Sequence, residues 1–152
     1  MSLPNLRHLY FDIMLDTNIC GETWSSPLET LRVCLSGAYG WDFWEQLLVG
    51  AANTLRVLVI AGGIADELET ILLCAPMITE LTLIHYFMWY DTGGDAEDHA
   101  AAAAALPDGL LHLQIMAIET APIQLCLLDA LAHELPRLSR LTEVKLGNLD
   151  TR

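Results

Sequence analysis

The chain has 152 residues, of which 53% are hydrophobic and 18% are charged. This length suits a single domain, and the composition excludes an intrinsically disordered chain. Twenty acidic residues against seven basic ones leave a net charge of −13, so nucleic acid and acidic membranes are unfavourable partners.

Six short apolar segments predict six β-strands. Each approximates the pattern L-x-x-L-x-L, where x is any residue, and they begin at Leu6, Leu31, Leu55, Ile78, Leu110 and Leu141. These starting positions differ by 25, 24, 23, 32 and 31 residues, which is the spacing of a repeat architecture. The phrase Thr-Leu-Arg-Val occurs at Thr30–Val33 and again at Thr54–Val57, which also supports a repeat.

Helical patterns lie between these strands. Apolar residues spaced three and four apart predict short helices over Trp44–Ala51 and Leu68–Ala75. An N-terminal cap followed by a run of alanines predicts a third helix from Asp95 to Ala105. A fourth helix is expected from Pro122 to Glu134, because proline is favoured in the first turn.

Alternating strands and helices predict an α/β fold with a parallel sheet. Two architectures satisfy this order: an open doubly wound sheet with helices on both faces, or a solenoid with all helices on one face. The shared phrases favour the solenoid, because stacked units occupy similar environments. We therefore expect one domain over residues 1–152 with about six irregular repeats, a parallel sheet on the concave face and helices on the convex face.

Three phrases resemble the leucine-rich-repeat family, in particular the irregular repeats that follow an F-box in many fungal proteins. They are Leu3-Pro-Asn-Leu-Arg-His-Leu, Leu55-Arg-Val-Leu-Val-Ile and Leu138-Ser-Arg-Leu-Thr-Glu-Val-Lys-Leu-Gly-Asn. The resemblance covers residues 3 to 149, although only Asn148 approaches the asparagine ladder of the family. It implies a non-enzymatic scaffold for protein–protein interaction, and more specifically the substrate-recognition part of an F-box-type ubiquitin-ligase adaptor.

The alternation of side chains along a strand identifies a candidate binding strip. If the pattern leucines point inward, the residues between them face outward on the concave side of the sheet. The candidate partner-binding residues are His8, Tyr10, Asp12, Glu80, Thr82, His112, Gln114, Met116, Glu143 and Lys145. In strands two and three the outward residues are expected to be Val33, Leu35, Val57 and Val59, with the opposite assignment left open. The acidic charge predicts a partner protein with a basic or mixed surface.

The alternative function is a small doubly wound enzyme or ligand-binding domain. Its site would lie at the carboxyl ends of the strands, near Gly62, Gly63 and Asp91. The chain lacks the H-E-x-x-H and G-x-S-x-G motifs, and the segment from Asp91 to His99 lacks the ligand spacing of a calcium loop. We therefore expect no catalytic residue, no metal and no cofactor.

The cysteines and apolar runs indicate a compartment. Cys20, Cys34, Cys74 and Cys126 lie far apart and form no zinc-type pair, so we expect buried free thiols. Unpaired thiols are typical of the reducing cytoplasm or nucleus. No apolar run reaches the roughly 20 residues that a membrane-spanning helix needs.

The ends of the predicted array suggest one further property. The first strand begins within six residues of Met1, and about six residues follow the last strand at Leu146. A solenoid needs caps at both ends, so we expect an incomplete array. Either an end strand mediates self-association, or a longer parent protein supplies further repeats.

Overall fold

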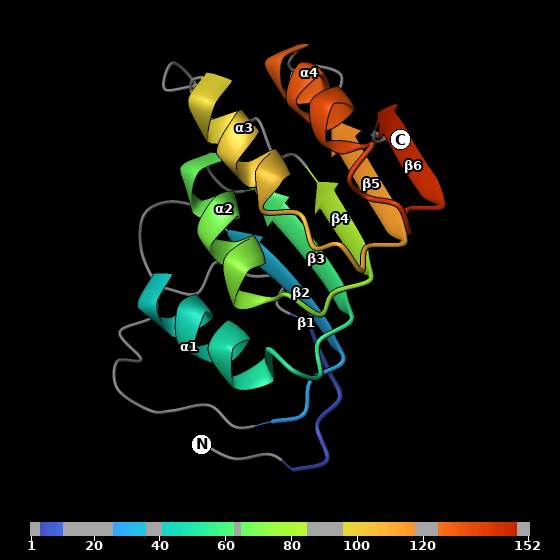
Figure 1. Cartoon of the computed structure of the whole chain (residues 1–152). Coiled ribbons are helices and arrows are strands. Elements are labelled where there is room, and N and C mark those ends of the chain that lie inside the picture. Colours follow the sequence, from blue (N-terminus) through green and yellow to red (C-terminus); the bar gives the residue numbers. More distant parts are fainter. Residues whose placement is uncertain are drawn as a thin grey trace.

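The structure is a computed structural model that describes residues 4–10, 26–35, 41–62, 65–84, 96–117 and 125–148. These residues form six strands and four helices, and helices and strands alternate along the chain after the second strand (Figure 1). Asp12, Cys20, Gly63 and Asp91, which the sequence singled out, lie outside the described residues.

The six strands form one parallel sheet whose order follows the sequence, β1-β2-β3-β4-β5-β6. This confirms the predicted α/β class and the parallel pairing. The strands are β1 (His8–Tyr10), β2 (Thr30–Leu35), β3 (Val57–Gly62), β4 (Glu80–Ile84), β5 (His112–Ala117) and β6 (Glu143–Asn148).

The described helices connect successive strands and lie on one face of the sheet (Figure 1). They are α1 (Trp41–Ala51), α2 (Ala65–Cys74), α3 (Ala96–Ala104) and α4 (Leu125–Glu134). Each helix contacts the next, so the four make a single layer. A right-handed crossover between neighbouring parallel strands places every connecting helix on the same side, which accounts for this arrangement.

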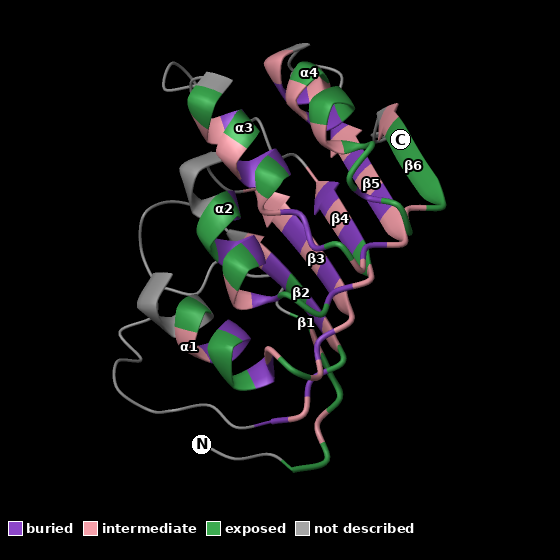
Figure 2. Ribbon diagram, viewed as in Figure 1, coloured by how far each residue is buried: buried purple, intermediate pink, exposed green. Residues whose placement is uncertain are grey.

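The core lies between this helical layer and the inner face of the sheet (Figure 2). The predicted helical stripes supply one side of it: Leu47, Leu48 and Ala51 of α1 are buried, as are Leu68, Ile71 and Leu72 of α2. The alternate residues of the strands supply the other side, for example Leu58, Ile60, Leu81, Leu83, Leu113 and Ile115. Burial of these stripes is what holds short helices in place, because helices of ten residues are marginal in isolation.

The pairing of β2 corrects one predicted repeat unit. The central apolar residues of the units form a row across the sheet, consisting of Leu9, Leu31, Leu58, Leu81, Leu113 and Val144. Leu31 is therefore the middle of its unit and Leu28 is its first residue. The two Thr-Leu-Arg-Val phrases are three residues out of register, because Thr30 pairs with Val57 and not with Thr54. The phrase repeats in the sequence without occupying equivalent positions.

The first apolar residue of each unit lies in the turn before its strand, so the strands begin two residues later than the pattern does. Leu28, Leu55, Ile78 and Leu110 occupy this position and are fully buried. The residue directly after this first apolar residue accepts hydrogen bonds at its carbonyl oxygen from two N–H groups of the following unit. The Arg7 carbonyl accepts from Glu29 and Thr30 at 2.8 and 3.0 Å. The same bond pair recurs at the carbonyls of Glu29, Arg56, Thr79 and Leu111.

The described cysteines differ from the prediction in their burial. Cys34, Cys74 and Cys126 are not in disulfides, as expected, but each is only half-buried. Cys34 pairs with Ala61 in the sheet register and lies on the face away from the helices, whereas its neighbour Val33 faces the core. The prediction of buried thiols was wrong because cysteine was assigned to the interior by residue type alone.

Candidate functional site

The outer sheet face is the face of the sheet turned away from the four described helices. Side chains cross it in rows, because alternate residues of each strand point to the same side, and two of these rows span all six strands. One row consists of His8, Thr30, Val57, Glu80, His112 and Glu143. The other consists of Tyr10, Arg32, Val59, Thr82, Gln114 and Lys145. None of them is fully buried.

Every described candidate residue lies on this face. The set comprises His8, Tyr10, Glu80, Thr82, His112, Gln114, Met116, Glu143 and Lys145. Asp12, the tenth candidate, is outside the described residues. Tyr10 is the most exposed large apolar side chain among them, at 59%.

The outward assignment was wrong in β2 and right in β3. Val33 is only 4% exposed and faces the helices, so Arg32 takes the outward position. Val57 and Val59 lie on the outer sheet face as expected. A shift of one residue exchanges the two faces of a strand. The sequence reasoning therefore missed Arg32, which alignment of the second unit on Leu28 identifies.

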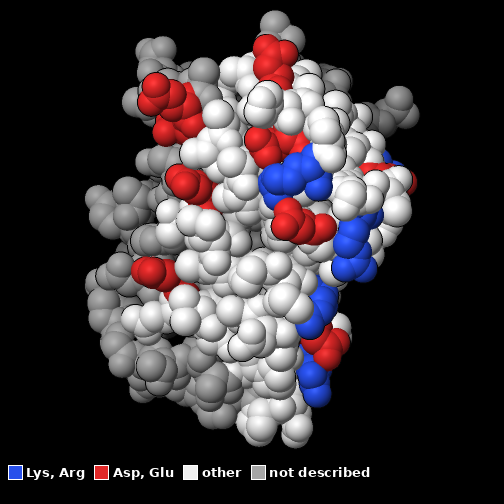
Figure 3. Space-filling view, viewed as in Figure 1, with Lys and Arg blue, Asp and Glu red and all other residues white. Residues whose placement is uncertain are grey.

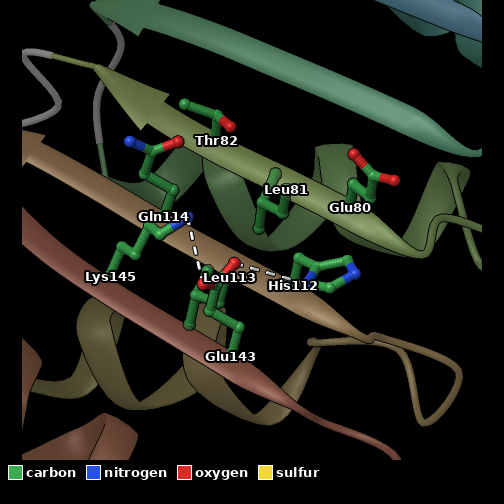
Figure 4. Close-up of a pocket in the computed structure, with 8 residues that line it drawn as sticks. All are labelled: Glu80, Leu81, Thr82, His112, Leu113, Gln114, Glu143 and Lys145. Carbon is green, nitrogen blue, oxygen red and sulfur yellow. Dashed lines mark ion pairs between the residues drawn. The ribbon is translucent and has the colours of Figure 1, made fainter.

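A shallow pocket of about 270 Å³ lies on the outer sheet face over β4, β5 and β6 (Figure 4). Its polar lining comes from Glu80, Thr82, His112, Gln114, Glu143 and Lys145, all of which are candidates from the sequence. Leu81 and Leu113 complete the lining. The structure thus brings six of the predicted residues together at one end of the sheet.

Glu143 is the centre of the polar contacts in this pocket (Figure 4). One carboxylate oxygen lies 3.0 Å from Lys145 Nζ, and the other lies 3.6 Å from His112 Nδ1. The second distance is too long for a hydrogen bond. His112 Nδ1 is itself enclosed and has no hydrogen-bond partner in the described structure.

The opposite side of the pocket carries a carboxylate that has no counter-ion among the described residues. Glu80 pairs with His112 in the sheet register and is exposed. No described residue forms an ion pair with it. Gln114 Nε2 donates to the weakly accepting Met116 Sδ, at 3.2 Å. The pocket therefore retains both acceptors and donors that a bound group can use.

Charge is distributed unevenly over the rest of the molecule. In Figure 3 the basic side chains gather along the edge at which the strands begin, whereas acidic side chains also spread over the helical layer. Several arginines at that edge are already paired within the fold. For example, Arg7 Nη1 lies 2.9 Å from Glu29 Oε1.

Other features of the described residues bear on the alternative function. Gly62 ends β3 with φ of 75°, a backbone conformation that glycine adopts without strain. Gly63 and Asp91 lie outside the described ranges. Among the residues that are described, no group of three or more His, Cys, Asp or Glu side chains could hold a metal ion. Within the same ranges, no helix has the length and hydropathy needed to cross a membrane.

Comparison with known proteins identifies no relative. No protein-family model, no curated protein and no solved structure matches the chain. The chemistry of the outer sheet face is therefore the basis for assigning a function.

Proposed function

We propose that the chain is a leucine-rich-repeat solenoid that binds another protein through the outer sheet face, without catalysing a reaction. The observation that carries the proposal is the pocket over β4 to β6, where six polar side chains from three strands converge. These side chains offer carboxylates, an amine, an imidazole and an amide, which suit reversible binding of polar and charged groups.

Three features of the fold support the solenoid. The strand order follows the sequence without reversal, and the described helices form one layer. The same carbonyl position accepts two N–H groups in five successive units. A doubly wound sheet instead reverses its strand order at a switch point, where its ligand binds.

The charges favour a partner segment that contains lysine or arginine. Glu80 has no counter-ion among the described residues, and Glu143 lies beside it across His112 in the sheet register. The net charge of −13 adds a long-range attraction for a basic partner. The resemblance to repeats that follow an F-box extends the proposal to a partner destined for ubiquitination in the cytoplasm or nucleus.

The test is to select peptides that bind the wild-type chain from a random displayed library, and then to measure their binding to two variants with the same change in charge. Glu80→Lys with Glu143→Lys reverses both carboxylates of the pocket. The control, Glu45→Lys with Glu69→Lys, makes the same charge change at exposed positions of α1 and α2. We expect peptides rich in lysine and arginine to bind the wild type and the control, and to lose at least about tenfold in affinity for the pocket variant.

Circular dichroism must show that both variants remain folded. Peptides that bind the folded pocket variant as tightly as the wild type would place the binding site elsewhere. Equal losses in both variants would indicate a general charge effect and not a site on the outer sheet face.

A further inference from the structure

Strand β6 exposes the side chains that other strands bury (Figure 2). Val144 and Leu146 are 41% and 50% exposed, although they pair in register with Leu113 and Ile115, which are 2% and 1% exposed. β6 is an edge strand, and it pairs only with β5 in the described sheet. An apolar edge strand of this kind is a template for pairing with another chain.

The backbone of β6 also presents hydrogen-bonding groups to the open edge. The Glu143 N–H donates to the Leu111 carbonyl at 3.2 Å, so the backbone groups of Glu143 face β5. Successive residues of a strand direct these groups to opposite edges. Val144 and Leu146, the residues with exposed apolar side chains, therefore also direct their N–H and carbonyl groups outward.

We propose that two copies of this chain associate through antiparallel pairing of β6 with β6, centred on Val144. In this register the two Val144 residues exchange a pair of backbone hydrogen bonds across the twofold axis. Glu143 of each copy lies directly opposite Lys145 of the second copy on the outer sheet face. Leu146 lies opposite Thr142 on the helical side.

Charge selects this register over its neighbours. In a twofold antiparallel pair, the two residues opposite each other direct their side chains to the same face of the sheet. The twofold axis must therefore pass between one residue and its own equivalent in the second copy. An axis at Lys145 would place two ammonium groups opposite each other, and an axis at Glu143 would do the same with two carboxylates. Directly opposed like charges destabilise a sheet, whereas opposite charges stabilise it. Only the axis at Val144 pairs Glu143 with Lys145 twice.

The second edge of the sheet offers a poorer surface. β1 has three residues, His8, Leu9 and Tyr10, with no aspartate, glutamate, lysine or arginine to match β6. Pairing of β6 with β1 would also be head-to-tail, which leads to open-ended assembly instead of a closed pair. A closed pair through β6 instead covers the open β6 edge of both copies at once.

The first experiment is disulfide trapping with two single-cysteine additions. In the proposed dimer the two Val144 Cα atoms lie about 5.5 Å apart, within the usual range for a disulfide. The two Leu146 Cα atoms lie about 14 Å apart along the strands. We expect mild oxidation to cross-link Val144→Cys to a dimer and to leave Leu146→Cys uncross-linked. Both variants retain the native cysteines, so they control for each other.

The second experiment is a charge exchange, read by sedimentation over a concentration series at physiological ionic strength. Glu143→Lys alone and Lys145→Glu alone each oppose like charges and should raise the dimer Kd about tenfold or more. The double variant restores opposite charges and should restore the dimer. Glu80→Lys, which alters the proposed partner site but lies away from β6, should leave the dimer Kd unchanged, so the two proposals fail independently.

Several outcomes would overturn this proposal. They are a wild-type chain that stays at the monomer mass of 16.8 kDa at every concentration, equal behaviour of the two cysteine variants, and a double variant that stays monomeric. Mass that grows beyond two copies would also overturn it, because that result indicates head-to-tail pairing.

Discussion

The thiol pKa of Cys74 is set by the surroundings of this single residue. Burial raises the pKa of this thiol, and the Glu45 carboxylate on the neighbouring helix raises it further. Because the thiolate is the reactive form, the side chain should be less reactive near neutral pH than an unperturbed thiol.

We expect the pH profile of Cys74 alkylation by iodoacetamide to be displaced to higher pH than that of glutathione. Mass spectrometry can follow the modification at this site alone. Glu45→Gln removes the smaller contribution, so it should return the profile part of the way and no further. A profile unchanged by Glu45→Gln would show that burial alone raises the pKa.

At the scale of elements, Arg137 joins the ends of two helices. Its guanidinium donates to the carbonyl of Ala104, the last residue of α3, and to that of Leu106 just beyond the helix, both at 3.0 Å. It also donates to Glu134 at 2.9 Å and to Asp108. The Arg137 hydrogen bond, followed by that of His133, lowers the pKa of Glu134. The α3 and α4 ends are thus held by one partly exposed side chain.

We expect Arg137→Ala to reduce the free energy of unfolding by about 1 to 2 kcal/mol at neutral pH, through loss of these hydrogen bonds. Arg140→Ala, at an exposed position in the same loop, should change it by less than about 0.5 kcal/mol. Urea unfolding measures both values.

The pH dependence of this difference has a definite sign. A carboxyl whose pKa is lowered in the folded state contributes stability above its unfolded pKa and loses it as the pH falls through the folded value. The Glu134 contribution should therefore disappear in acid. The gap between wild type and Arg137→Ala should narrow there, and a gap that widened in acid would contradict this account.

The same scale shows what could be predicted from the sequence. Strand number, order and most helix positions followed from apolar spacing, because each unit must bury one face of its strand and one stripe of its helix. The orientation of β2 could not be predicted in this way. A unit that starts at Leu31 directs Val33 and Leu35 outward, whereas an equally plausible unit that starts at Leu28 directs Leu31 and Val33 to the core. Only pairing with β1 and β3 distinguishes these assignments, and that information is not local to the strand.

The candidate site was accessible to sequence reasoning for a related reason. Its residues occupy the outward positions of β4, β5 and β6, where the apolar alternation is unambiguous. Their convergence into one pocket was not predictable, since it depends on how neighbouring strands align. The burial of His99, which is 1% exposed on α3, was also missed because its surroundings come from tertiary packing.

At the scale of the whole molecule, one charge distribution has opposite consequences for the two proposed interactions. The net charge of −13 attracts a basic partner but repels a second copy of the chain. Both effects act over long distances at low salt, and the Debye length falls from about 30 Å at 0.01 M to about 8 Å at 0.15 M. The backbone hydrogen bonds of the β6 pair depend far less on salt.

We therefore expect added salt to slow association with a lysine-rich peptide and to strengthen the dimer over the same range of ionic strength. Stopped-flow association rates measure the first effect, and sedimentation measures the second. Glu45→Lys with Glu69→Lys reduces the net negative charge by four without touching either surface, so it should reduce both salt dependences. A dimer that weakens steadily as salt rises to 0.15 M would mean that the Glu143–Lys145 contacts, and not the net charge, dominate its electrostatics.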